Sequence, residues 1–344
     1  MEKQLGNTFK DKKILVTGGT GCIGSEIVKN LLKYKPNVVR IFSNDEDNTF
    51  KMLQELPDGK YTRFLIGDIR DKERLILAME DIDIVYHAAA LKHVPLCEYN
   101  PFEAIKTNVL GTQNVIEAAL NTGVKKVINI STDKAVNPVN TMGATKLLAE
   151  KLMIDANFYK GPSKTIFSCV RFGNVLFSRG SVVPLFEQQI KDKKMVTMTD
   201  PKMTRFMMSI NNTIDLVFKA TLMAKGGEIF ILKMPVVKLG DLTDVIIKKY
   251  SEEYGYKPNQ IKKITIGSRP GEKMYEELMT ETEAKKAFET DDMLIIPPQV
   301  EIGITLKISD YKNAYKSKLE RYVSRDAKPL SKEGINKLLW ENDR

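Results

Sequence analysis

The segment of residues 13–32 constrains the fold of this chain more than any other. A short apolar run at residues 13–16 is followed by Gly18, Gly21 and Gly24, after which apolar residues recur at helical intervals. The first glycine permits a tight turn, the second lets the backbone approach a pyrophosphate, and the third lets the helix pack close to the strand. An ordinary glycine-rich loop is the alternative. As the first strand-to-helix turn of the chain, however, this segment predicts a dinucleotide-binding fold.

Strand and helix patterns continue to alternate after this turn. Apolar runs predict strands at residues 38–42, 61–66, 82–86 and 126–130, and a helical pattern such as that of residues 108–120 lies between them. This alternation predicts the α/β class, with a Rossmann-like, doubly wound parallel sheet whose sites lie at the carboxyl ends of the strands. In the second half, we expect a strand at residues 227–232 and helices at residues 239–250, 273–278 and 311–323.

The carboxyl ends of these strands supply the expected cofactor contacts. Asp68 follows the third strand, where a carboxylate can accept a hydrogen bond from an adenine amino group, although a helix N-cap is the alternative. Ser43 and Asn44 follow the second strand, where an acidic residue would repel a 2′-phosphate, so we favour NADP over NAD without support from an arginine. The predicted cofactor-binding residues are Gly18, Thr20, Gly21, Cys22, Ile23, Gly24, Ser43, Asn44, Asp68, Ile69, Ala88, Ala89, Ala90, Asn108, Ser131 and Lys146.

A second segment, residues 131–146, predicts where chemistry takes place. Short-chain dehydrogenases carry Tyr-x-x-x-Lys here, with the tyrosine as acid and base, whereas this chain has Met142 four residues before Lys146. A thioether neither takes nor gives a proton, so proton transfer must fall to neighbouring side chains. The predicted catalytic residues are Thr132, Asp133, Lys134 and Lys146. A surface ion pair between Asp133 and Lys134 is the alternative, and we interpret Met142 as packing near the site.

The glycine turn, Ser131 and Lys146 resemble the extended short-chain dehydrogenase/reductase superfamily. More specifically, the chain resembles the nucleotide-sugar 4,6-dehydratases of bacterial polysaccharide and glycan synthesis, in blocks that run in family order from about residue 12 to about residue 295. These blocks are residues 91–101, 131–138, 171–175, 178–182, 203–206 and 270–273. The resemblance implies a lyase with a tightly bound NADP or NAD that is regenerated each turnover. It implies UDP-N-acetylglucosamine as the usual substrate.

The resemblance also implies two interleaved domains. We expect residues 1–175, joined by about residues 205–230, to form the NAD(P)-binding domain. Residues 176–204 and 231–344 are then expected to form mainly a smaller substrate-binding domain and a C-terminal tail.

The implied reaction oxidises the sugar C4 hydroxyl, removes the C5 hydrogen, expels the C6 hydroxyl as water and returns the hydride to C6. Within it, Lys134 could be the base at C5, provided that desolvation lowers its pKa. Asp133 would protonate the leaving C6 oxygen, and we also expect it to accept the C4 hydroxyl proton, directly or through Thr132 or a water. Lys146 would hold the nicotinamide ribose.

Basic and polar side chains of the second half are expected to hold the substrate. Arg179 can pair with a phosphate bidentately, and Arg205 and Arg269 are further candidates. The predicted substrate-binding residues are Lys92, Asn174, Ser178, Arg179, Ser181, Arg205, Arg269 and Glu272. For each single arginine, a solvated surface position is the alternative.

Composition limits the possible partners. A net charge of +9 suits an anionic substrate, and no basic stripe interleaved with aromatic residues indicates nucleic-acid binding. The 3 scattered cysteines and 2 histidines predict neither a disulfide framework nor a metal site. No apolar run is long enough to span a bilayer and residues 1–13 are polar, so we expect a cytoplasmic protein without a membrane span. The superfamily implies a homo-oligomer, either a dimer or a larger assembly.

Three other functions remain open. The first is a GDP-N-acetylglucosamine 4,6-dehydratase of a legionaminic-type pathway. The second is a nucleotide-sugar 4-epimerase, which ordinarily relies on the missing tyrosine and does not need Asp133 and Lys134. The third is a non-catalytic NAD(P)-binding scaffold, which the presence of Thr132, Asp133, Lys134 and Lys146 together argues against.

Overall fold

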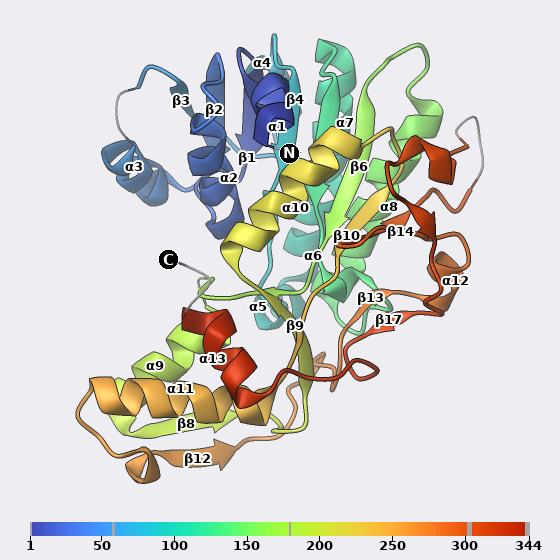
Figure 1. The fold of residues 1–344 in the computed structure, drawn as a ribbon. Coiled ribbons are helices and arrows are strands. Elements are labelled where there is room, and N and C mark those ends of the chain that lie inside the picture. The colour runs from blue at the N-terminus through green and yellow to red at the C-terminus, as the bar shows by residue number, and fades with distance from the viewer. Residues whose placement is uncertain (1, 57–58, 179, 301–304, 341–344) are drawn as a thin grey trace.

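A large, mostly parallel sheet forms the centre of the molecule (Figure 1). The computed structural model describes residues 2–56, 59–178, 180–300 and 305–340. The sheet has 10 strands in the order β3-β2-β1-β4-β5-β6-β10-β15-β14-β16. Its parallel strands are β1 (Lys13–Thr17), β2 (Val38–Ser43), β3 (Thr62–Ile66), β4 (Ile84–His87), β5 (Lys126–Ile130), β6 (Ile166–Arg171) and β10 (Ile229–Leu232). The antiparallel strands are β14 (Phe288–Glu289), β15 (Met293–Ile296) and β16 (Tyr315–Lys316).

Helices cover both faces of this sheet. On one face α1 (Glu2–Phe9) and α2 (Cys22–Leu32) pack against α10 (Ile210–Met223), and on the other α4 (Lys72–Met79), α7 (Gly111–Thr122) and α8 (Thr141–Tyr159) pack side by side. Residues of the parallel strands are mostly buried, as expected for strands covered on both faces, except in the edge strand β3. The remaining helical segments of this part are α3 (Glu46–Glu55), α5 (Val94–Tyr99), α6 (Pro101–Ala104), the π-helical η1 (Ile105–Leu110) and the 3₁₀ turn η2 (Asp133–Ala135).

A smaller unit with its own apolar core lies below the carboxyl ends of the parallel strands (Figure 1). It contains α9 (Val182–Lys193), α11 (Leu239–Glu253), η3 (Pro258–Gln260) and α13 (Lys332–Trp340), and its strands β8 (Met195–Met198) and β12 (Lys262–Thr265) pair in parallel. Two small sheets connect it to the large one. They are formed by β7 (Asn174–Val175), β9 (Thr204–Met208) and β11 (Val236–Lys238), and by β13 (Glu277–Met279) and β17 (Tyr322–Val323). The short α12 (Glu281–Ala284) and η4 (Ile308–Asp310) complete the described elements.

The predicted fold class is confirmed, since the strand order is that of a doubly wound Rossmann-like sheet with a smaller unit added. Strands β14 to β16 extend the large sheet, although they lie in the range 231–344 that we assigned mainly to the substrate domain. The domain boundaries therefore stay a prediction. Among the described residues, no helix combines the length and the apolar composition that crossing a membrane requires.

Two predicted helices are wrong. Residues 273–278 lead into β13, because the backbone N–H of Glu276 donates to Ser324 and draws this segment into pairing with β17. Residues 311–323 contain β16 and β17 instead of a helix. In both segments pairing with distant strands overrides the local helical preference.

Candidate active site

The glycine turn has the geometry that its sequence predicts. Gly18 has φ +64°, and a Cβ there would lie 2.7 Å from the Cα of Ala89. A Cβ on Gly24 would collide with the carbonyl oxygen of Gly18. Both glycines are therefore required where α2 begins, next to the carboxyl ends of β1 and β4. The start of a helix at this place suits a pyrophosphate, whose charge the free N–H groups and the helix dipole stabilise.

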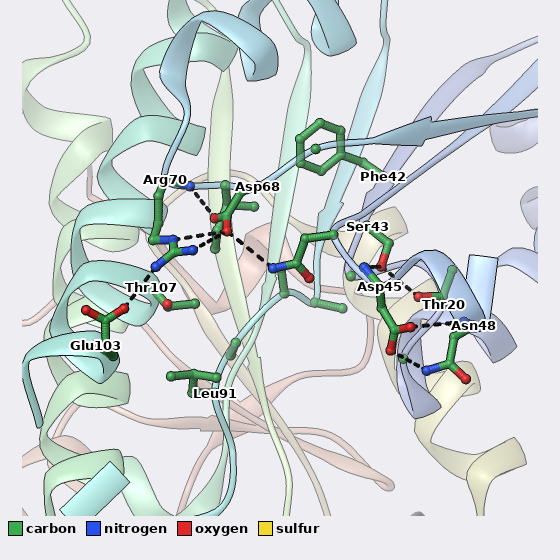
Figure 2. A pocket seen from close by; sticks show the side chains of 18 residues that line it. Thr20, Phe42, Ser43, Asp45, Asn48, Asp68, Arg70, Leu91, Glu103 and Thr107 are labelled. Carbon is green, nitrogen blue, oxygen red and sulfur yellow. Dashed lines mark hydrogen bonds and ion pairs between the residues drawn. The ribbon is translucent and has the colours of Figure 1, made fainter. Parts of the chain in front are cut away.

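A cavity of about 360 Å³ lies beside this turn, and most of the predicted adenosine contacts line it (Figure 2). Asp68 accepts hydrogen bonds from Asn44 Nδ2 at 3.2 Å and from Arg70 Nη2 at 2.6 Å. Burial pushes the pKa of Asp68 up, but the bonds from Arg70 and Asn44 outweigh burial and lower it. The N-cap of α4 is Asp71 and not Asp68, so Asp68 is free to face a ligand. The predicted residues that line this cavity are Gly18, Thr20, Gly21, Ser43, Asn44, Asp68, Ile69, Ala88, Ala89 and Ala90.

An arginine, Arg70, lines this cavity, although our preference for NADP had no support from an arginine in the sequence. Arg70 bonds to Asp68 and, through Nη1 at 2.9 Å, to Glu103, as Figure 2 shows. The Asp45 carboxylate caps α3 by accepting from the Asn48 N–H at 2.9 Å, while Ser43 bonds to Thr20 at 2.7 Å. The acidic side chain after β2 is thus held by its own helix, and a cation lies on the opposite side of the cavity.

The predicted catalytic pair lies at the carboxyl end of β5, with Asp133 buried and Lys134 partly exposed. The Asp133 side chain is fully buried, and its Oδ1 accepts from Thr132 Oγ1 at 2.9 Å and from Lys134 Nζ at 2.9 Å. The backbone N–H of Asp133 donates to the carbonyl of Phe172 at 3.0 Å, which fixes the turn against β6. A surface ion pair, the alternative interpretation, is thereby excluded. Lys134 lines two cavities and is paired with the buried Asp133, and such a paired charge at a cavity is typical of an active site.

The expected lowering of the Lys134 pKa is wrong for this arrangement. Burial pushes the pKa of Lys134 down, but the carboxylates of Asp133 and Glu276 outweigh burial and raise it. The resting side chain is therefore an ammonium group. To act as a base, it has to lose a proton first.

Lys146 lies beside this pair, and its pKa is shifted in the opposite direction from that of Lys134. Its Nζ donates to the carbonyl of Ile130 at 2.7 Å, and burial lowers its pKa to about 8. Met142 is buried next to Cys97 and Ala104, as we expected for packing near the site. It also lines a second cavity, together with Lys146. This cavity has a volume of about 550 Å³ and joins the glycine turn to the catalytic residues. The predicted residues that line it are Gly18, Gly21, Cys22, Ile23, Gly24, Ala88, Ala90, Lys92, Ser131, Thr132, Lys134, Lys146, Asn174, Ser178 and Ser181.

Two predicted cofactor residues have structural partners. The Ser131 hydroxyl donates to Glu150, although the residue lines the cavity. Asn108 is buried and bonds to the backbone N–H of Leu91 at 2.8 Å, to its carbonyl at 3.0 Å and to Thr145 Oγ1 at 3.0 Å. Asn108 therefore holds the loop after β4, and contact with the cofactor stays a prediction for it.

A third cavity, of about 300 Å³, brings together most of the predicted substrate residues. Lys92, Asn174, Arg205, Arg269 and Glu272 line it, and Arg205 Nη2 donates to the carbonyl of Lys273 at 2.8 Å. Arg179 lies outside the described residues. The predicted residues thus converge from both halves of the chain onto one site beside Lys134.

Several residues that line these cavities are not among those that the sequence predicted. Glu276 is 3% exposed and lies in the segment that we predicted to be a helix, directly after the Pro270–Lys273 block. Asn140 caps α8 and also binds the carbonyl of Gly271 at 2.8 Å. His93 and Arg70 follow strand ends, which is a signal that the sequence did contain.

Comparisons with known proteins agree with this geometry. The family model described as polysaccharide biosynthesis protein matches residues 14–298. An uncharacterized membrane protein of Methanocaldococcus jannaschii is 56% identical over 341 residues, covering 99% of either chain. A UDP-N-acetylglucosamine 4,6-dehydratase (inverting) of Campylobacter jejuni is 45% identical over 296 residues, covering 86% of this chain and 85% of that protein. A UDP-glucose 4-epimerase of Rickettsia conorii is 42% identical and covers 97% of both.

The similarity extends to solved structures. The X-ray structure of Pen from Bacillus thuringiensis is 49% identical in sequence, with a TM-score of 0.90, over 97% of this chain and 98% of that chain. Both the matched family model and these relatives span most of the sequence, including the glycine turn, the Asp133–Lys134 pair and the substrate cavity. The chain therefore belongs to the polysaccharide biosynthesis protein family.

Proposed function

We propose that this chain is a nucleotide-sugar 4,6-dehydratase, a lyase that converts UDP-N-acetylglucosamine to a UDP-4-keto-6-deoxy-N-acetylhexosamine for surface glycan biosynthesis. The observation that carries the proposal is the Thr132–Asp133–Lys134 group beside Lys146, in which Asp133 is fully buried, with a methionine in place of the usual tyrosine. The Campylobacter relative named for this activity supports the choice of substrate. The Rickettsia relative supports a 4-epimerase as the second candidate.

The shape of the cavities fits a dinucleotide cofactor. The space beside Gly18 and Gly24 exists because neither residue has a Cβ, and Asp68 and Arg70 lie where an adenosine group would fit. An NAD(P) held by these residues would supply the hydride chemistry between C4 and C6. Arg70 can pair with a 2′-phosphate and Asp45 is engaged in capping α3, so we favour NADP over NAD.

The residues of this chain divide the proton transfers between them. Asp133 accepts the C4 hydroxyl proton through Thr132, whose hydroxyl already donates to it, and later gives that proton to the departing C6 oxygen. Lys134, once neutral, removes the C5 hydrogen and afterwards returns a proton to C5. Lys146 stabilises negative charge on the C4 oxygen while it remains protonated, which its pKa of about 8 permits at neutral pH.

The proposal is tested by incubating the purified protein with UDP-N-acetylglucosamine, GDP-N-acetylglucosamine or UDP-glucose in deuterated water, with no reductant. Loss of one water with deuterium at C5 is expected for the first sugar, and mass spectrometry measures it. Water loss from the GDP sugar alone would instead assign the GDP-linked substrate. An unchanged mass with C4 inversion by NMR would favour the epimerase.

A matched pair of lysine variants adds a control. Lys134→Ala is expected to abolish elimination, whereas Lys125→Ala, at an exposed lysine that pairs with Asp83 and lines none of the three cavities of the site, keeps it. A non-catalytic scaffold would be indifferent to both variants. Equal activity of the two variants would contradict the role given to Lys134.

A further inference from the structure

Glu276 lies beside the Asp133–Lys134 pair and takes no part in the proton transfers proposed for that pair. Its Oε1 lies 3.8 Å from Lys134 Nζ and 3.9 Å from Arg205 Nε. Its backbone is anchored on both sides, since its N–H donates to Ser324 Oγ at 3.0 Å and its carbonyl accepts from the Ser324 N–H at 2.9 Å. Lys134 is therefore held between two carboxylates, with Asp133 on β5's side and Glu276 on β13's side.

Both carboxylates carry an oxygen that is buried without a partner. Asp133 Oδ2 and Glu276 Oε2 have no hydrogen bond within the described parts of the chain. Leaving a buried polar atom unpaired costs about 1–3 kcal/mol, and native proteins do so at few places. Two such atoms around one lysine indicate groups that gain their partners, or a proton, during the reaction.

The charge state of Lys134 poses the problem that Glu276 can solve. Asp133 has to be ionised to accept the C4 hydroxyl proton, and Lys134 has to be neutral to remove the C5 hydrogen. The proton of the resting ammonium therefore needs a third group. Burial raises the pKa of Glu276, and the charge of Asp133 adds to the effect, against the pull of Lys134 and Arg205. Among these groups Glu276 is a carboxyl group suited to hold a proton.

We propose that Glu276 is a positioning residue for the proton of Lys134, which it takes up before elimination and gives back after turnover. This inference rests on the proposed dehydratase function. In the step, an N–H bond of the Lys134 ammonium breaks and an O–H bond forms on Glu276, so no electrons are transferred. The distance of 3.8 Å is bridged by one water or by a small movement of either side chain.

The free amine of Lys134 then takes the C5 proton. The C5–H electron pair forms the C5–C6 double bond, and the C6–O bond breaks as the oxygen leaves with the proton from Asp133, as water. Because the proton passes only between Lys134 and Glu276, the active and resting forms hold the same number of protons. The Lys134–Glu276 pair therefore adds no pH dependence to the rate of elimination between its own two pKa values.

The test is the pH dependence of kcat for water loss in Glu276→Gln, at saturating UDP-N-acetylglucosamine. Glutamine keeps the shape and cannot take the proton, so Lys134 must release it to solvent. Between about pH 6 and about pH 8, where Lys146 keeps its charge, we expect a flat profile for the wild-type protein and a rate that rises about tenfold per pH unit in the variant. Glu277→Gln is the matched control, because Glu277 is the neighbouring carboxylate and its Oε2 accepts a hydrogen bond from Asn137 Nδ2 at 2.7 Å. It should keep the flat profile.

Glu276→Asp keeps a titratable carboxyl group and is expected to keep the flat profile at a lower rate. A flat profile with unchanged kcat in Glu276→Gln would overturn the inference, and so would a higher KM alone. A sloped profile in Glu276→Asp would also overturn it, even if the glutamine variant did not fold. If the wild-type protein loses no water from any of the sugars, the proposed function fails, and this inference fails with it.

Discussion

Burying the charged ammonium group of Lys146 costs folding free energy, and the proposed reaction requires that charge. Burial lowers its pKa from 10.5 to about 8, because the ammonium group loses most of its water on folding. Between these two values the unfolded chain binds more protons than the folded chain. The free energy of unfolding therefore rises with pH in that window. Below about pH 8 the full cost of burying the Lys146 ammonium group lowers the stability of the folded chain.

Replacing Lys146 with methionine should remove this pH dependence together with the activity. Relative to Lys146→Met, we expect the unfolding free energy of the wild-type protein to increase by about 2–3 kcal/mol between pH 7 and about pH 10. Urea denaturation of both proteins at the two pH values measures the difference. Because every other titrating group is shared, a constant difference between the proteins would contradict the low pKa.

At this scale the sequence predicted the residues that lie close together in the chain. Thr132, Asp133 and Lys134 follow one strand, and the offset of Lys146 places it on the facing side of the next helix, as observed. Glu276 joins them only through pairing of β13 with β17, about 140 residues later in the chain. No local pattern encodes that pairing, so this carboxylate was missed.

Asn140 connects a helix end to the substrate cavity. Its Oδ1 accepts from the Gly143 N–H at 2.7 Å as the N-cap of α8, and its Nδ2 donates to the Gly271 carbonyl at 2.8 Å. Asn140→Ala should lower the unfolding free energy by about 1 kcal/mol through loss of the cap. It should also raise the KM for the nucleotide sugar, because the loop at residues 269–273 loses its anchor.

Asn140→Asp separates these two effects. Aspartate keeps the oxygen that caps α8 but has no N–H for the Gly271 carbonyl. We expect wild-type stability in denaturation and a raised KM in steady-state kinetics. An aspartate variant with the wild-type KM would show that the hydrogen bond to Gly271 does not position the loop.

Among the elements, the strands and helices of the first half were predicted well because their period is strong and their connections are short. The glycine turn identified the first strand–turn–helix unit, and the later strands and helices of the first half followed the same alternation. The predicted helices at residues 273–278 and 311–323 failed because those segments lie against distant strands. Tyr311, for example, is buried with its hydroxyl donating to Glu228 at 2.8 Å, a contact that outweighs helical preference.

Across the whole molecule, Arg171 joins the large sheet to the returning C-terminal segment. Its buried guanidinium pairs with Glu150 on α8 and, at 3.0 Å, with Glu283 on α12, and it donates to the Leu278 carbonyl at 2.7 Å. Arg171→Met leaves the buried carboxylate of Glu150 and the partly buried carboxylate of Glu283 without their cation. We expect a loss of about 3–5 kcal/mol in the free energy of unfolding, measured by urea denaturation.

Arg321→Met is the control for that variant. Arg321 pairs with Asp326 at 2.8 Å, but both side chains are exposed to solvent, which screens the pair. Its replacement should cost much less than that of Arg171. Similar losses for both variants would mean that the buried group does not hold the two parts of the chain together.

The surface of α5 and α6 leads to an expectation about assembly. Leu96, Tyr99 and Phe102 are 62%, 87% and 62% exposed within seven consecutive residues, an unusual concentration of apolar surface. A second copy of the chain could cover it in a two-fold interface, in which the same patch meets itself. We therefore expect the protein to self-associate, with sedimentation velocity giving at least a dimer at micromolar concentration.

The double variant Tyr99→Lys, Phe102→Lys places like charges opposite each other and should be monomeric, whereas Tyr315→Lys, at an exposed tyrosine of β16, should assemble normally. A monomeric wild-type protein, or a double variant that still assembles, would show that this surface has another purpose.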